Sequence, residues 1–158
     1  MNLADKVRLA GVVGAGGGGF PTHVKLGAKA EVVIANGAEC EPLLHKDAVT
    51  MEENAADMVR GIQLAMEAVG ACEGVIGVKA KKKHAVAAVQ EASKGTNVRV
   101  QLLGDYYPAG DEYDLVYNVT GKLIPPGGIP IAVGAIVNNV ETFVNIARAH
   151  DGQPLTHK

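Results

Sequence analysis

Residues 14–25 read GAGGGGFPTHVK, the part of this chain where glycine is most concentrated. Gly14, Gly16 and Gly19 satisfy the pattern GxGxxG, and Pro21 suits the first turn of a helix that follows. Glycine leaves the backbone N–H groups bare, so such a loop ahead of a helix can bind a phosphate. The pattern also occurs in ordinary flexible connections. By itself it therefore predicts either a phosphate-binding loop or a plain turn.

On both sides of this loop the sequence alternates between helical and apolar extended patterns. Strands are expected at 31–35, 75–78 and 98–103, with a last apolar run at 131–137. Helices are expected at 2–10, 21–27, 82–93, 111–119 and 140–149. A further, long amphipathic helix is expected behind Thr50, which forms a capping box with Glu53. The alternation predicts an α/β fold, a three-layer Rossmann-like domain with a mainly parallel sheet covered on both faces.

Polar residues follow three of the expected strands. Asn36, Asp105 and Asn138 each stand at or just beyond the end of an apolar run. Open parallel sheets bind ligands beyond the carboxyl ends of their strands. We therefore expect these three loops to converge with the glycine loop on one cofactor cleft. No domain boundary interrupts the pattern, so residues 1–158 are expected to form a single domain.

Composition narrows the classes of function. The chain has 158 residues, 47% of them hydrophobic, which is typical of a globular protein. A formal net charge of −2, the lack of tryptophan and 4% aromatic residues disfavour a nucleic-acid partner. Without a signal pattern or an apolar run of the ~20 residues that a membrane helix needs, we expect a cytoplasmic protein that does not insert into a membrane. Cys40 and Cys72 are far apart, and no His/Cys spacing predicts a metal site.

The complete glycine-rich string resembles the flavin loop, GxGGxGFPTxxK, of the respiratory complex I flavin subunit and its relatives. Three more blocks match that family in the same order. They are NGAECEP at 36–42 with Lys46-Asp47, YPAGDE at 107–112, and VNNVET at 137–142. Within this superfamily, NGAECEP and the PPGG loop at 125–128 are most similar to the branch of the Rnf complex C subunit and the cobalamin reductase of propanediol-degrading microcompartments.

The resemblance implies an FMN site and a set of residues that would form it. The implied cofactor-binding residues are Gly14, Gly16, Gly17, Phe20, Lys25, Asn36, Glu39, Glu41, Tyr107, Gly110, Asp111, Glu112, Asn138 and Asn139. The glycine backbone would line the flavin, with Lys25 beside the ring as a cation that favours the reduced anion. Phe20 would pack on the adenine of NADH, and the carboxylates would contact ribose and amide groups. No residue is assigned a catalytic role, because the cofactor carries the hydride chemistry.

Simpler interpretations stand beside these roles. Lys25 is otherwise a solvated helix residue, and Phe20 a core anchor after a glycine turn. Asn139 suits an N-cap as well as a ligand. Cys40, between two carboxylates, is expected to pack and not to act as a nucleophile. The lysines of residues 79–83 favour a solvated helix face, or else contact with a phosphate or an acidic partner.

The implied activity is that of an NADH:acceptor oxidoreductase, with hydride transfer from NADH to FMN and single electrons passed to an iron–sulfur centre. Two cysteines are too few to hold a 4Fe–4S cluster, so the cluster is expected in segments beyond this sequence or in a redox partner protein. The chain would then be the N-terminal part of a longer protein, docked on a membrane complex or placed in a microcompartment. Complex I relatives follow the loop lysine with aromatic residues. Here Leu26-Gly27-Ala28 follow it, which weakens the expectation of NADH more than that of FMN.

Two alternatives stay open. One is a binding or scaffold module that keeps the fold without redox function. The other is a flavin-free NAD(P)-binding Rossmann domain, in which Glu39 would be the ribose-binding acid. A yellow colour of the purified protein would favour the flavin hypothesis over both.

Overall fold

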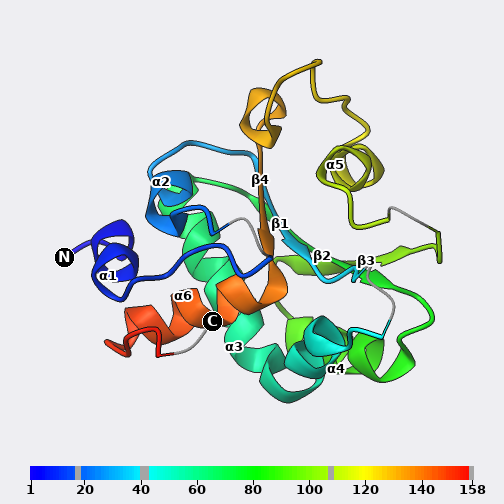
Figure 1. The fold of residues 1–158 in the computed structure, drawn as a ribbon, viewed down its shortest axis with the longest axis horizontal. Helices are drawn as coiled ribbons and strands as arrows, with labels where there is room; N and C mark the ends of the chain where they lie inside the picture. The colour runs from blue at the N-terminus through cyan, green and yellow to red at the C-terminus, as the bar shows by residue number, and fades with distance from the viewer. Residues whose placement is uncertain (17–18, 40–42, 107–108, 157–158) are drawn as a thin grey trace.

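The computed structural model describes residues 1–16, 19–39, 43–106 and 109–156, and their core is one parallel sheet (Figure 1). Its strands are β1 (Val32–Asn36), β2 (Glu73–Lys79), β3 (Val98–Leu103) and β4 (Ala135–Asn139). They lie in the order β3-β2-β1-β4, and each neighbouring pair is parallel. All the carboxyl ends therefore meet at one edge of the sheet.

Helices cover both faces of this sheet, as the sequence predicted. One face carries α1 (Leu3–Leu9), α2 (Thr22–Leu26), α3 (Lys46–Val69), α4 (Lys83–Ser93) and α6 (Val140–His150). The other carries α5 (Glu112–Thr120) and the short 3₁₀ helix η1 (Pro130–Val133). Right-handed crossovers explain this division, because β1, β2 and β3 follow one another in one direction, whereas the chain returns from β3 to β4 in the opposite direction.

Strand β1 shows why the sequence forms buried strands. Val33 and Ala35 pack into the core under α3 and α6, whereas Val32 and Ile34 pack into the core under α5. A strand buried on both faces needs a continuous apolar run, not an alternating one. The helices of the larger core also approach closely, since a Cβ added at Gly61 of α3 would collide with the backbone oxygen of Phe143 in α6. The α/β three-layer prediction is confirmed.

Two expected elements differ in their boundaries. Helix α3 begins at Lys46, so Thr50 lies inside it and the predicted capping box does not start it. Lys46, the first residue of the helix, forms ion pairs with Asp47 and Glu141. The helix is kinked at Asn54, whose backbone is not helical.

The last apolar run divides into two elements. Gly134, with φ +78°, ends η1 and separates it from β4. A run of apolar residues therefore contributes a helical turn and then a strand. In the part of the chain that the structure describes, no helix has both the length and the apolar character needed to cross a membrane.

Candidate functional site

A cleft of about 600 Å³ opens at the carboxyl ends of β1 and β4. The order of strands reverses here, since β2 follows β1 on one side while the chain returns to β4 on the other. Ligands of open α/β sheets bind at such a position. The residues that line the cleft come from all four sequence blocks: Gly14, Ala15, Gly16, Gly19, Phe20, Lys25, Asn36, Ala38, Glu39, Leu44, Lys46, Asp47, Gly110, Glu112, Val137, Asn138 and Asn139.

The glycine loop folds back on itself and lies over the start of α6. The Gly14 N–H donates to the Phe20 carbonyl at 2.8 Å, and the Ala15 N–H donates to Thr142 Oγ1 at 3.1 Å. A Cβ at Gly16 would meet only the Asn139 Cβ, at 3.7 Å, so this position opens onto the cleft. The loop connects α1 to α2, and Val13 makes only an isolated bridge with Pro21. The strand–loop–helix unit of an ordinary dinucleotide fingerprint therefore does not form at this loop.

Lys25 projects from α2 to the end of β4. Its Nζ donates to the Val137 carbonyl at 2.6 Å and to Asn138 Oδ1 at 3.1 Å. Burial lowers the pKa of Lys25, and the negative charge of Glu112 offsets part of this effect. Its Nζ also lies 5.5 Å from the centre of the Phe20 ring. Lys25 is thus fixed at the wall of the cleft and is not a solvated helix residue.

Phe20 lines the cleft with 48% of its surface exposed, so the interpretation of a core anchor is wrong. The aromatic ring is held beside a cation and open to solvent. An exposed ring in this position offers a flat apolar surface to a ligand.

The three asparagines of the cleft have different roles. Asn36 donates to the Gly110 carbonyl at 2.9 Å and accepts from the Ala38 N–H at 3.1 Å, so it braces two loops. Asn139 caps α6 by accepting from the Glu141 N–H at 2.9 Å. Asn138 is buried, and its Nδ2 has no hydrogen-bond partner within the described residues. Asn138 is therefore the asparagine whose amide is left for a ligand.

An ion network forms one wall of the cleft. Lys46 Nζ contacts Asp47 Oδ1 at 2.7 Å and Glu141 Oε2 at 2.9 Å, and Asn139 Nδ2 donates to Asp47 Oδ2 at 2.9 Å. Burial raises the pKa of Asp47, as does the charge of Glu39, while Lys46 and Asn139 oppose that rise. Burial lowers the pKa of Lys46, but the hydrogen bonds and charges of Asp47 and Glu141 outweigh it, so the pKa is raised.

Sequence reasoning placed Lys46 and Asp47 in a matching block but did not include them among the site residues. It also missed Thr142, whose hydroxyl anchors the glycine loop. The signal was present in the sequence, because all three residues belong to the matching blocks.

Some expected residues lie elsewhere. Asp111 caps α5 by accepting from the Asp114 N–H at 3.1 Å and does not line the cleft. Asp105 follows β3, two strands away from β1, and pairs with Lys79 and Lys81 instead. Glu39 and Glu112 do line the cleft, and Glu39 Oε2 is buried with no hydrogen-bond partner among the described residues. Gly17, Cys40, Glu41 and Tyr107 lie outside the described residues.

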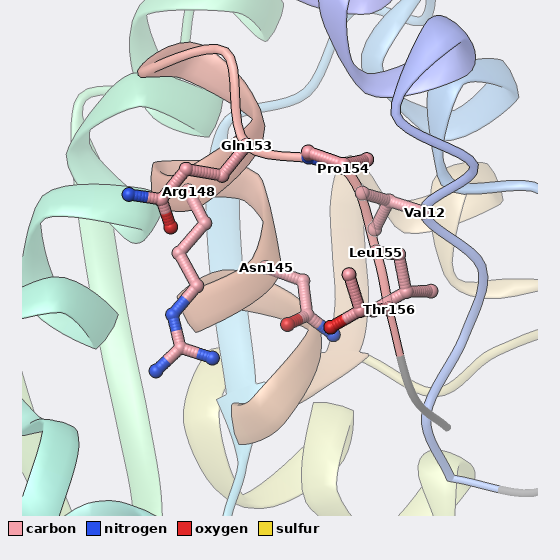
Figure 2. A pocket seen from close by; sticks show the side chains of 7 residues that line it. All are labelled: Val12, Asn145, Arg148, Gln153, Pro154, Leu155 and Thr156. Atoms are coloured by element: carbon pink, nitrogen blue, oxygen red, sulfur yellow. The ribbon is translucent and has the colours of Figure 1, made fainter.

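A second hollow of about 370 Å³ lies between α6, Val12 and residues 153–156 (Figure 2). The Leu155 N–H donates to the Ala10 carbonyl at 2.8 Å, which holds this last segment against the chain near α1. In Figure 2 the Arg148 guanidinium turns away from the segment, and it donates to Asn54 Oδ1 at 3.2 Å at the kink of α3. This hollow involves none of the predicted cofactor residues. Across residues 1–16, 19–39, 43–106 and 109–156, no group of His, Cys, Asp and Glu is arranged to hold a metal ion.

Comparison with known proteins identifies relatives along almost the whole chain. A family model described as the Nuo51 FMN-binding domain matches residues 7–148. The cobalamin reductase PduS of Salmonella typhimurium is 47% identical over 157 residues, which cover 99% of this chain and 35% of that protein. The C subunit of the proton-translocating ferredoxin:NAD(+) oxidoreductase complex of Clostridium ljungdahlii is 41% identical over 157 residues, which cover 96% of this chain and 34% of that protein. The chain therefore spans about a third of the length of these curated relatives.

The fold also matches a solved structure. A chain of an NAD+-reducing NiFe-hydrogenase in the air-oxidized state superposes with a TM-score of 0.76 at 26% sequence identity, covering 94% of this chain and 30% of that chain. The two curated relatives, a cobalamin reductase and a C subunit of a ferredoxin:NAD(+) oxidoreductase complex, correspond to the two types of protein that the sequence motifs resemble.

Proposed function

This chain belongs to the Nuo51 FMN-binding domain family, and from this premise we propose that it holds one FMN molecule in the cleft between β1 and β4. In this proposal residues 1–158 act as one flavin domain of an NADH-linked oxidoreductase. The cobalamin reductase, the ferredoxin:NAD(+) oxidoreductase and the NAD+-reducing hydrogenase are relatives whose names describe redox enzymes. The proposal extends that chemistry to this chain.

Three buried side-chain polar atoms have no hydrogen-bond partner among the described residues, and the two that belong to residues lining the cleft carry the proposal; the third is Thr22 Oγ1. Glu39 Oε2 is an acceptor and Asn138 Nδ2 is a donor, and both side chains line the cleft. A buried polar atom without a partner costs about 1–3 kcal/mol, so a native protein leaves one mainly where a ligand completes it. The pyrimidine edge of a flavin ring carries both N–H and C=O groups. It can therefore satisfy an acceptor and a donor together.

The remaining lining fits the other parts of FMN. Gly14, Gly16 and Gly19 line the cleft without side chains, and α6 begins directly behind the loop, so a phosphate could approach the loop backbone and a helix N-terminus, although the Gly14 N–H already donates to Phe20. Lys25 would hold its ammonium beside the ring, fixed by Val137 and Asn138. A cleft of about 600 Å³ is within the usual range of roughly 300–1,000 Å³ for ligand pockets. The donor set and the volume both fit the cofactor.

Bound FMN would supply the hydride and single-electron chemistry. The residues of this chain bind and orient. Lys25 places positive charge at the cleft wall, and the negative charge of Glu112 favours the charged form of Lys25. Phe20 offers an exposed ring for the nicotinamide cofactor. The iron–sulfur centre that would receive electrons is assigned to a partner protein or to a further segment. Docking on a membrane complex and residence in a microcompartment are the two settings that the sequence motifs imply, and the name of one relative describes a proton-translocating complex.

The test is a titration of the purified chain with FMN, followed by quenching of flavin fluorescence. We expect saturable binding, and we expect Gly16→Val to weaken it by more than about tenfold, because the valine side chain projects into the cleft. Gly27→Val is the matched control, since a Cβ there meets only the Val24 carbonyl at 3.6 Å and the His23 carbonyl at 3.9 Å. Its affinity for FMN should stay that of the parent chain.

Two further outcomes would decide between the hypotheses. Bleaching of the bound flavin by NADH under anaerobic conditions supports nicotinamide as the donor, whereas stable yellow colour in excess NADH assigns the donor to another molecule. Lack of FMN binding by a folded parent chain would contradict the proposed function and favour a module without redox activity.

A further inference from the structure

A group of lysines lies on the turn between β2 and α4, outside the cleft. Lys79, the last residue of β2, is buried, whereas Lys81 and Lys83 are exposed. Asp105 compensates part of this charge, at 3.7 Å from Lys79 Nζ and 2.8 Å from Lys81 Nζ. No carboxylate in the described part of the chain pairs with Lys82 or Lys83. The turn therefore keeps a net positive charge on a protein whose formal net charge is −2.

Two of these lysines, Lys82 and Lys83, lie at the N-terminus of α4, where their positive charge destabilises the helix. The helix begins at Lys83 with Lys82 at its N-cap, and it has neither a side-chain cap nor an acidic residue in its first turn. The N-terminus of a helix carries partial positive charge, which favours Asp or Glu and disfavours lysine. A local arrangement that works against stability is expected where function requires it.

An exposed apolar tip adjoins the lysines. Leu43 is 91% exposed and has φ +66°, a backbone conformation that is unusual for leucine. Leu44 and Val49 are also exposed, and Leu44 lines the cleft. His45 joins the two groups, because its Nδ1 lies 3.4 Å from Lys82 Nζ. We call Leu43, Leu44, Val49 and Lys81–Lys83 together the rim surface.

We propose that the rim surface docks an acidic electron-carrier protein beside the mouth of the cleft, an inference that rests on the proposed function. An apolar centre bordered by charge is the usual anatomy of a protein interface. Opposite charge steers a carrier to the surface and raises its rate of association. Leu44 belongs both to the rim surface and to the cleft lining, so a carrier bound here would lie next to the cofactor.

The experiment measures binding of a plant-type [2Fe–2S] ferredoxin, chosen for a negative net charge, to the immobilised full chain at low and high salt. The test variant carries Lys81→Gln, Lys82→Gln and Lys83→Gln. The control variant carries Lys29→Gln, Lys94→Gln and Lys122→Gln, which remove the same charge from exposed positions that do not line the cleft. We expect the test variant to lose about tenfold or more in affinity and most of the salt dependence, while the control keeps both.

A second variant separates function from stability. Leu43→Asn suits the positive φ better than leucine, so the chain should be as stable or more stable in urea while the ferredoxin binds more weakly. Equal losses in the two lysine variants, or no ferredoxin binding at low salt, would overturn the proposal. Blocking by pyrophosphate at micromolar concentration would also overturn it, because that result identifies a site for a small phosphate. The FMN titration, done in parallel, tests the proposed function independently, since ferredoxin binding requires no bound flavin.

Discussion

The carboxyl ends of the four strands lie at one edge of the sheet, and this edge has two regions with different structures. Beside β1 and β4 the edge opens into a cleft lined by Asn138, Glu39 and the glycine loop. Beside β2 and β3 the strand ends are joined by an ion pair between Lys79 and Asp105. All four strands are parallel and end at this edge, so strand direction does not explain the difference. The residues that follow each strand do.

The connections explain why the cleft opens where it does. β1 is followed by a long loop that leads away to α3, whereas β2 is followed at once by the turn into α4. β4 has no loop at all, because Asn139 is both its last residue and the N-cap of α6. The space above β1 and β4 is then covered by a loop of glycines, which have no side chains to fill it. A binding site at a sheet edge thus depends on which connections leave the edge empty.

The largest effect is expected from the first residue after β1. A Cβ at Gly37 would lie 2.7 Å from Met51 Sδ and 2.9 Å from the Gly77 carbonyl, which belongs to the backbone and cannot move aside. We expect Gly37→Ala to lower the free energy of unfolding by about 2–3 kcal/mol, measured by urea denaturation. Gly104→Ala, after β3, should cost less than about 1 kcal/mol, since its new Cβ meets only the exposed Tyr106 ring, at 3.1 Å. Equal losses would mean that the two regions are packed alike.

The half-buried Lys25 and the buried Lys79 give the next contrast. Lys25→Met removes the ammonium that contacts Val137 and Asn138, and should weaken FMN binding by about ten- to a hundredfold, because charged hydrogen bonds contribute roughly 1.5–3 kcal/mol. Lys79→Met should leave FMN affinity unchanged and stability within about 1 kcal/mol, because its partner Asp105 is exposed and stays hydrated. Fluorescence titration and urea denaturation measure both. Weaker FMN binding in Lys79→Met would show that the cofactor site extends across β2.

The smallest effect is a difference in pH dependence between Asp47 and Asp105. Burial raises the pKa of Asp47 in the folded protein above the ordinary 3.8. As pH rises from 3.8 through this raised pKa, the folded state therefore loses stability, because folding opposes the ionisation of Asp47. The hydrogen bond from Lys81 lowers the pKa of Asp105, so its contribution is present above pH 3.8 and is lost as pH falls towards the lowered pKa. The measurement is the urea midpoint of unfolding at several pH values. As pH rises, the midpoint of Asp47→Asn should increase relative to that of the parent chain, whereas the midpoint of Asp105→Asn should decrease relative to it. Parallel profiles for the two variants would contradict the assignment.

Much of the cleft was foreseen because it depends on local sequence. Glycine, Lys25 and the asparagine pair stand in short blocks whose order and spacing resemble one family, and the structure brings Gly14, Lys25, Glu39 and Asn138 to one cleft. Asp105 was expected there too, because it follows a strand as Asn36 does. The expectation failed since the order of strands along the chain does not reveal which strands are neighbours, and β3 lies at the far side of the sheet.

Periodicity along the chain was enough to establish the class of fold and most of the helices and strands, because apolar spacing reflects which faces are buried. It was not enough to place the start of α3, where Lys46 pairs with Asp47 and with Glu141 of the distant α6. Nor did it distinguish the roles of Asn138 and Asn139, which are neighbours in sequence with the same side chain. One caps α6 and the other keeps a donor without a partner among the described residues, because successive residues of a strand point to opposite faces. Which polar atoms remain unpaired depends on contacts between segments far apart in the chain, and those arise only when the sheet and its helices pack together.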